Sequence, residues 1–144
     1  MALINRSAHA VAGKMRAVAR RRRGFQHELE IGSHTVTVDE PEAQGGTDQG
    51  PSPQELLAAS LASCTAVTME MYADRKGWDV DGLEVDCRYT PAERGCPTRF
   101  ELVMKMPAHL SEEQVERLQV IAAKCPVHRT LEGEVAFEER VELT

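Results

Sequence analysis

The feature that most constrains the fold is a long helix predicted over about residues 53–76, with no continuous polar face. Ser52 is suited to the N-cap, Pro53 to the first helical position, and Glu55 to closing a capping box with Ser52. Gly77 suits the left-handed residue that follows a helix. Apolar and small side chains occur on all sides, so we expect the helix to be enclosed on most of its surface.

The length of this helix also bears on the oligomeric state. Its roughly 24 residues make it about 36 Å long at 1.5 Å per residue. A chain of 144 residues is the size of a single domain and has little material with which to surround such a helix. We therefore expect one domain over residues 1–144, with a poorly ordered segment at 1–13 and a partner subunit covering part of the helix. The uncharged part of the helix, 56–69, is shorter than a typical membrane span, which favours a core helix.

Composition and charge narrow the function classes. Hydrophobic residues make up 42% and charged residues 28% of the chain, which is typical of a globular protein. The net charge of −6 argues against a nucleic-acid partner, although five arginines lie between Arg16 and Arg23. No secretory signal is recognisable, so we expect a cytoplasmic protein that is not associated with a membrane. In that compartment a disulfide is expected to cycle rather than to persist.

The segments before the long helix predict strands. Polar and apolar residues alternate over 15–38, and Gly24 and Gly32 divide this segment into about three short antiparallel strands. Residues 39–50 contain a Gly-Gly pair and predict a loop.

The segments after the long helix predict a mixed arrangement. Alternation over 83–89 and 100–106 indicates a β-hairpin with one buried face. Ser111 opens an amphipathic helix that ends at Cys125, and alternating apolar residues at 135–143 indicate a final strand. The fold class is therefore α+β, with helices packed on antiparallel sheet.

Two of the four cysteines need little explanation. Cys87 lies on the inward face of a predicted strand, which indicates packing, and Cys96 follows a glycine in a turn. Cys64 is either a small core residue or a reactive thiol. Several hydroxyl side chains lie near it in a helix otherwise rich in apolar residues, which favours reactivity; they are Ser60, Ser63, Thr65 and Thr68.

Cys125 is the more suggestive cysteine. Because Pro126 follows it, Cys125 can cap the next helical turn, where free backbone N–H groups favour a thiolate. His128 can add a donor or a positive charge. A Cys-x-x-His pair is also half of a zinc site, but no second closely spaced pair completes it, so a metal site remains the lesser alternative.

Two motifs resemble those of the OsmC/Ohr family. The first is the run Gly-Pro-Ser-Pro-Gln-Glu-Leu-Leu over 50–57, followed by Ser-Cys at 63–64; the second is Cys-Pro-Val-His at 125–128. Their separation, the intervening hairpin and the terminal strand also fit, so the resemblance covers nearly all of the chain after about Met15. It implies an OsmC-like fold, with antiparallel sheets around a buried central helix, and an intertwined homodimer.

The resemblance also implies an activity. Family peroxidases reduce organic hydroperoxides without metal or haem, which gives Cys64 the attacking role and Cys125 the resolving role. No cofactor is expected beyond an external dithiol reductant, which the resemblance suggests is of lipoyl type. Two alternatives stay open: a non-catalytic module that binds an apolar small molecule in the dimer cleft, and a structural protein whose cysteines only pack.

The resemblance further implies an arginine from the N-terminal strands that stabilises the thiolate, together with a glutamate that holds it. Arg23 is the best match for the arginine, with Arg22 next. Family peroxidases have the glutamate directly after the helix-starting proline, where this chain has Gln54. Glu55, one residue later, is the candidate carboxylate, about 100° further around the helix.

Overall fold

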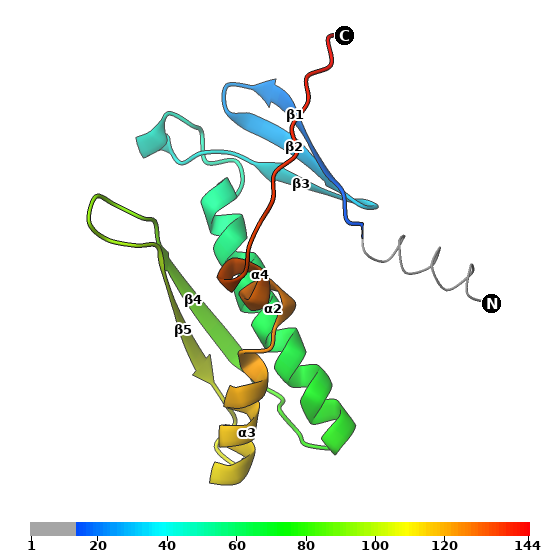
Figure 1. The fold of residues 1–144 in the computed structure, drawn as a ribbon, viewed down its shortest axis with the longest axis vertical. Coiled ribbons are helices and arrows are strands. Elements are labelled where there is room, and N and C mark those ends of the chain that lie inside the picture. Colours follow the sequence, from blue (N-terminus) through cyan, green and yellow to red (C-terminus); the bar gives the residue numbers. More distant parts are fainter. Residues whose placement is uncertain (1–13) are drawn as a thin grey trace, which may run out of the picture. The chain divides into compact units, whose positions relative to one another are not determined.

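The computed structural model describes residues 14–144, so the prediction for residues 1–13 lies outside the described residues (Figure 1). The chain divides into two compact units, the first ending at Leu56 and the second running from Leu57 to Thr144. That residues 1–144 form one domain stays a prediction, and the two units are described in turn. The class is α+β, as predicted, with antiparallel sheets and one long helix.

The first unit contains the three predicted strands. β1 (Ala17–Arg23), β2 (Gln26–Ile31) and β3 (His34–Val38) form an antiparallel sheet in that order. Gly24 and Gly32 make the turns with φ of 54° and 58°, a conformation that glycine adopts without strain. The register gives the sheet one apolar and one charged face, because side chains alternate along each strand.

A loop at 39–50 connects β3 to the long helix and includes a short 3-10 helix, η1 (Glu42–Gln44). Asp39 organises this loop from a buried position. Its carboxylate accepts hydrogen bonds from the hydroxyl and N–H of Thr47 and from the N–H groups of Glu40 and Gln49. The loop thus delivers the chain to the helix start in a fixed conformation.

The long helix, α2 (Pro53–Lys76), has the predicted ends. Glu55 N–H donates to Ser52 Oγ at 3.2 Å, and the Glu55 carboxylate accepts from Ser52 N–H at 3.0 Å, which is the predicted capping box. Gly77 follows the helix with φ of 71°. By length and composition alone α2 is apolar enough to cross a membrane, a test that the core helix of a globular protein also passes.

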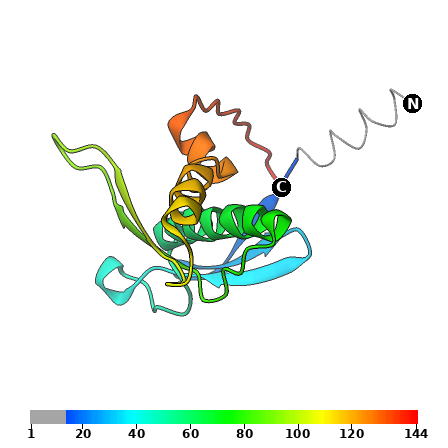
Figure 2. The same ribbon diagram turned by 90° about the horizontal axis from the view of Figure 1, so that it is seen from below.

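The second unit packs the rest of α2 with a hairpin and two helices. β4 (Glu84–Thr90) and β5 (Arg99–Lys105) form the predicted antiparallel hairpin. Figure 2 shows α3 (Glu112–Ala122) lying against α2, and α4 (Pro126–Glu132) follows it. The core joins the two longer helices through four buried side chains, Met69, Ala73, Leu118 and Ala122.

Two details of the predicted elements are wrong. The amphipathic helix ends at Ala122 rather than at Cys125, because the chain turns before Pro126. Cys125 is the N-cap of α4, as predicted. No strand forms over 135–143, where the apolar side chains of Val135 and Phe137 are exposed. A strand needs a hydrogen-bonded neighbour, and none of residues 14–144 pairs with this segment.

The expected enclosure of α2 is only partly met within the described chain. Met69 and Ala73 are fully buried, but the side chains of Val67 and Met71 are 44% and 63% exposed. That a partner subunit covers part of the helix stays a prediction.

Candidate functional site

Cys64 and Cys125 come together in the second unit. Cys64 lies near the middle of α2 and is half-buried, whereas Cys125 is fully buried directly before α4. Both are free thiols, and they are close enough for a hydrogen bond between them to shift the pKa of each. The two cysteines that the sequence singled out, 61 residues apart, are therefore neighbours in space.

The local structure around the two thiols differs. Thr65 and Thr68 follow Cys64 on α2, and the buried Thr65 hydroxyl donates to Leu61 O at 2.8 Å. Cys125 is held by the turn after α3, since its N–H donates to Ala122 O at 3.3 Å. Pro126 occupies the first turn of α4, where its lack of an N–H costs nothing.

The environments of the two thiols differ. Burial raises the pKa of Cys64 and the hydrogen bond with Cys125 raises it further, against smaller lowering effects from the Val127 N–H and Thr68. Burial also raises the pKa of Cys125. Hydrogen bonds from Cys64 and the His128 N–H, with smaller ones from Thr65 and the Val127 N–H, outweigh burial and leave this pKa below its usual value. Within this unit, negative charge is therefore favoured on Cys125.

A histidine–carboxylate pair stands next to the thiols. The His128 N–H donates to Cys125 Sγ at 3.4 Å, and the Nε2 atom of the same residue lies 2.8 Å from the Glu132 carboxylate. The other ring nitrogen, Nδ1, is buried and has no hydrogen-bond partner among residues 14–144. Sequence reasoning noted His128 but missed Glu132, which the i, i+4 spacing on a helix after Pro126 would have revealed.

A metal is not supported by the geometry of these residues. Within residues 14–144, no group of three or more His, Cys, Asp or Glu side chains is placed to hold a metal ion. Cys125 and His128 thus stand without the further ligands that a zinc site needs.

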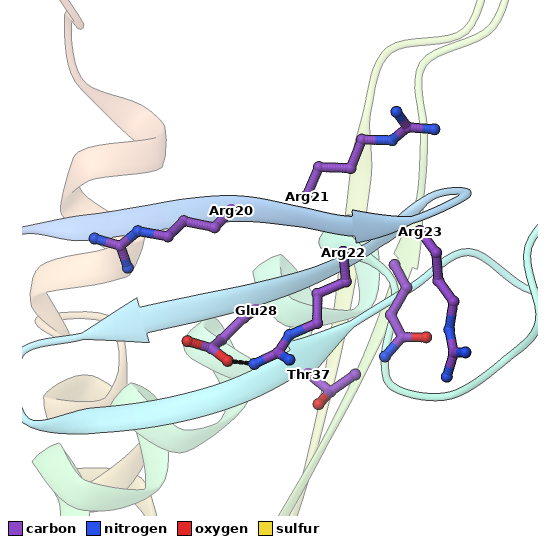
Figure 3. A pocket seen from close by; sticks show the side chains of 7 residues that line it. Arg20, Arg21, Arg22, Arg23, Glu28 and Thr37 are labelled. Carbon is purple, nitrogen blue, oxygen red and sulfur yellow. Dashed lines mark ion pairs between the residues drawn. The ribbon is translucent and has the colours of Figure 1, made fainter.

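The arginine candidates lie on β1, beside a cleft of about 780 Å³ in the first unit (Figure 3). A β-bulge between Arg21 and Arg23 leaves Arg22 as the extra residue. Arg22 forms an ion pair with Glu28, whereas Arg23 sits opposite Gln26 and has no ion pair within the described chain. Of the two candidates, Arg23 is the one whose guanidinium is not already neutralised.

The carboxylate of Glu55 serves a structural role in the first unit. It accepts the Ser52 N–H, and this hydrogen bond lowers its pKa. In the described part of the chain no ion pair joins Glu55 to Arg22 or Arg23. Its predicted role of holding an arginine stays a prediction.

Comparisons with known proteins agree on one family. The family model "OsmC-like protein" matches residues 46–140, more than half of the chain. An OsmC-like protein from Mycoplasma pneumoniae superimposes with a TM-score of 0.71 at 20% identity, over 83% of this chain and 88% of that one. No curated protein matched significantly.

Two structures of organic hydroperoxide resistance proteins are also similar. OsmC from Legionella pneumophila gives a TM-score of 0.60 at 18% identity, over 82% of this chain and 90% of that one. OhrB of Bacillus subtilis gives 0.57 at 23% identity, over 83% and 91%. At these identities the likeness shows the shared fold.

Proposed function

Because the chain belongs to the OsmC-like protein family, we propose that it is a thiol peroxidase that reduces organic hydroperoxides through Cys64 and Cys125. The observation that carries this proposal is the pair of free thiols brought together between α2 and α4. A half-buried thiol beside a second, buried thiol is an arrangement suited to a redox site. The related structures named for organic hydroperoxide resistance supply the substrate class.

The proposed reaction has two steps at sulfur. The Cys64 thiolate attacks the peroxide O–O bond, which yields a sulfenic acid on Cys64 and releases an alcohol. The Cys125 thiol then condenses with the sulfenic acid, which yields a disulfide and water. An external dithiol, which we propose to be of lipoyl type, reduces the disulfide, and no metal or bound cofactor takes part.

The first step requires a positive charge near Cys64, because its surroundings in the second unit raise its pKa. A guanidinium lowers a thiol pKa and can also bind the oxygen that becomes the leaving alkoxide. Arg23 is our candidate for this role, since Arg22 is already paired with Glu28.

We propose further that the working form is a cytoplasmic homodimer. Exposed Val67 and Met71 on α2, and the apolar residues after α4 that are exposed in the described chain, leave apolar surface that a second copy could cover. Sedimentation at micromolar concentration should show a dimer, and a stable folded monomer would contradict this.

One observation favours a second candidate, a non-catalytic module that binds an apolar ligand. Glu55 is engaged in the capping box and does not hold an arginine within the described chain. If no arginine lay near Cys64, its thiol would stay protonated and would not attack a peroxide.

Turnover separates the two candidates. Purified protein should consume cumene hydroperoxide continuously when a lipoyl dithiol is supplied, and the Cys64→Ser variant should not. Binding of the peroxide without its consumption would support the non-catalytic module instead.

A further inference from the structure

The two proposed redox cysteines differ in how far another molecule can reach them. Cys64 is half-buried, whereas Cys125 is 0% exposed. The burial of Cys125 comes from its own chain, and a partner subunit can only cover further surface, so Cys125 stays enclosed in any assembly of this structure. In thiol–disulfide exchange the incoming sulfur must approach the sulfur that it attacks. Of the two sulfurs, Cys64 Sγ is therefore the one within reach of an external thiol.

The same two cysteines differ in how well each sulfur carries a negative charge. The His128 N–H donates to Cys125 Sγ at 3.4 Å. Burial raises the pKa of Cys125, but the hydrogen bonds to its sulfur, among them this one, outweigh burial and leave the pKa below its usual value. Burial raises the pKa of Cys64. Because the thiol with the lower pKa leaves faster in thiol–disulfide exchange, Cys125 is the better leaving group of the two.

We propose that the external dithiol attacks Cys64 Sγ of the Cys64–Cys125 disulfide and that Cys125 leaves as a thiolate stabilised by the His128 N–H, an inference that rests on the proposed peroxidase function. One reductant thiolate forms a bond to Cys64 Sγ as the protein disulfide breaks, and the electron pair of the broken bond stays on Cys125. The second reductant thiolate then attacks the reductant sulfur joined to Cys64. This releases the Cys64 thiolate and closes a disulfide within the reductant. The dithiol gives up two electrons and two protons, which the two protein sulfurs receive.

The hydrogen bond from His128 to Cys125 can be removed without loss of a bond within the helix. Once Cys64 carries the reductant, its sulfur has no hydrogen to donate, so the Cys125 thiolate depends more on the His128 N–H. This N–H lies in the first turn of α4, where N–H groups have no acceptor within the helix, and it donates to Cys125 Sγ. Proline at position 128 would therefore remove this one donor and no helical hydrogen bond.

The direct test maps the first adduct formed by a monothiol, which cannot carry out the second exchange. Full-length protein is oxidised with one equivalent of diamide, which forms the disulfide without a peroxide, and 2-mercaptoethanol is then added. Samples are quenched with acid at increasing times, free thiols are alkylated, and mass spectrometry maps the peptides. Extrapolated to zero time, nearly all of the mixed disulfide should be on Cys64, with Cys125 alkylated. A mixed disulfide chiefly on Cys125 would overturn the proposal.

Matched variants test the hydrogen bond to the leaving sulfur. His128→Pro removes the N–H and His128→Ala keeps it, so dithiothreitol should reduce the disulfide about tenfold more slowly in the first, because a hydrogen bond to a charged group is typically worth about that factor or more. The redox equilibrium should also shift toward the disulfide in His128→Pro. Gln114→Pro is the control, since Gln114 has the same position in α3, and it should be reduced at the wild-type rate. Equal rates in His128→Pro and His128→Ala would contradict the role of this N–H.

The outcomes distinguish this inference from the function on which it rests. If diamide forms the disulfide but cumene hydroperoxide does not, the peroxidase proposal fails, and the adduct map still decides which sulfur is attacked. If the peroxide forms the disulfide and the adduct is on Cys125, the inference alone fails. If neither oxidant joins Cys64 to Cys125, both fail. The adduct map uses the wild-type chain, so it decides the inference even if His128→Pro does not fold.

Discussion

Helices α3 and α4 both begin at an N-cap whose side chain accepts a backbone hydrogen bond, but only α3 has a complete capping box. At α3, Ser111 Oγ accepts the Gln114 N–H at 3.1 Å, and the Gln114 side chain reaches back to the Ser111 N–H at 2.9 Å. At α4, Cys125 Sγ accepts the His128 N–H, but the ring of His128 bonds forward to Glu132. At the start of α3, the side chains of Ser111 and Gln114 therefore bond to each other's backbone N–H groups. At the start of α4, His128 Nδ1 has no hydrogen-bond partner among residues 14–144.

This difference shows how a structural motif can hold reactive groups. The N-cap position supplies a hydrogen bond from the backbone to any cap side chain that can accept one. A hydroxyl uses that bond only for stability, but a thiol gains a lower pKa from it as well. The predictions below test whether residues at the start of α4 take part in the reaction, while those at the start of α3 only stabilise the helix.

The largest effect is expected for Cys64, the neighbour of the α4 N-cap Cys125. Cys64→Ser should abolish peroxide reduction, because a hydroxyl without a matched base is a far weaker nucleophile. A peroxide consumption assay measures this. Cys96→Ser is the matched control, since Cys96 is exposed in the hairpin turn and should keep full activity. Activity retained in Cys64→Ser would show that another residue attacks.

Cys125→Ser converts the α4 cap to the residue type found at α3. Serine is a good N-cap, so thermal stability should hold. Catalysis should stop after about one equivalent of peroxide, with a dimedone-reactive sulfenic acid on Cys64 that then over-oxidises. Continued turnover, or a first sulfenic acid on Cys125 in the wild type, would reverse the assigned roles.

Arg23→Ala tests whether α4 alone activates the pair. A neighbouring cation typically lowers a thiol pKa by about 1 to 3 units, so its loss should slow sulfenic acid formation by about tenfold or more at neutral pH. Stopped-flow kinetics would give this rate. Arg22→Ala is the comparison, and because Arg22 is paired with Glu28 it should change the rate less. The opposite ranking would move the role to Arg22.

Ser111→Ala opens the α3 cap without touching the thiols. It should cost about 1 kcal/mol of unfolding free energy, the usual value for a lost N-cap, and leave peroxide reduction unchanged. Urea denaturation measures the loss, and Ser111→Thr should restore most of it. An equally large loss of activity would mean that α3 contributes to the site.

Glu55→Gln makes the α2 cap resemble that of α3, and the expected effect is small. The Ser52 N–H holds the Glu55 pKa below its usual value. This hydrogen bond therefore stabilises the fold above the unfolded pKa, about 4.3, and the contribution is lost as pH falls through the lower folded pKa. The variant should unfold with a weaker pH dependence between about pH 5 and 3. An unchanged pH profile would show that the α2 cap does not depend on this charge.

Local signals made much of the fold predictable. Both ends of α2 follow from Ser52, Glu55 and Gly77, and the hairpin follows from strict alternation. Cys64 and Cys125 were placed together by the resemblance to a known family, because nothing local in the sequence relates two positions 61 residues apart.

The predictions that failed depend on partners that a sequence pattern does not reveal. Alternating apolar residues at 135–143 fit a strand, but a strand requires a neighbour to pair with. Glu132 was missed for another reason. The turn that begins at Pro126 was predicted, but the i, i+4 relation between His128 and Glu132 within it was not drawn from the sequence.

The most direct test of the account is disulfide mapping after a single oxidation. Reduced protein receives one equivalent of cumene hydroperoxide, free thiols are alkylated, and peptides are sequenced by mass spectrometry. The account predicts a Cys64–Cys125 disulfide, with Cys87 and Cys96 alkylated. An unchanged thiol count, or a disulfide that includes Cys87 or Cys96, would contradict it.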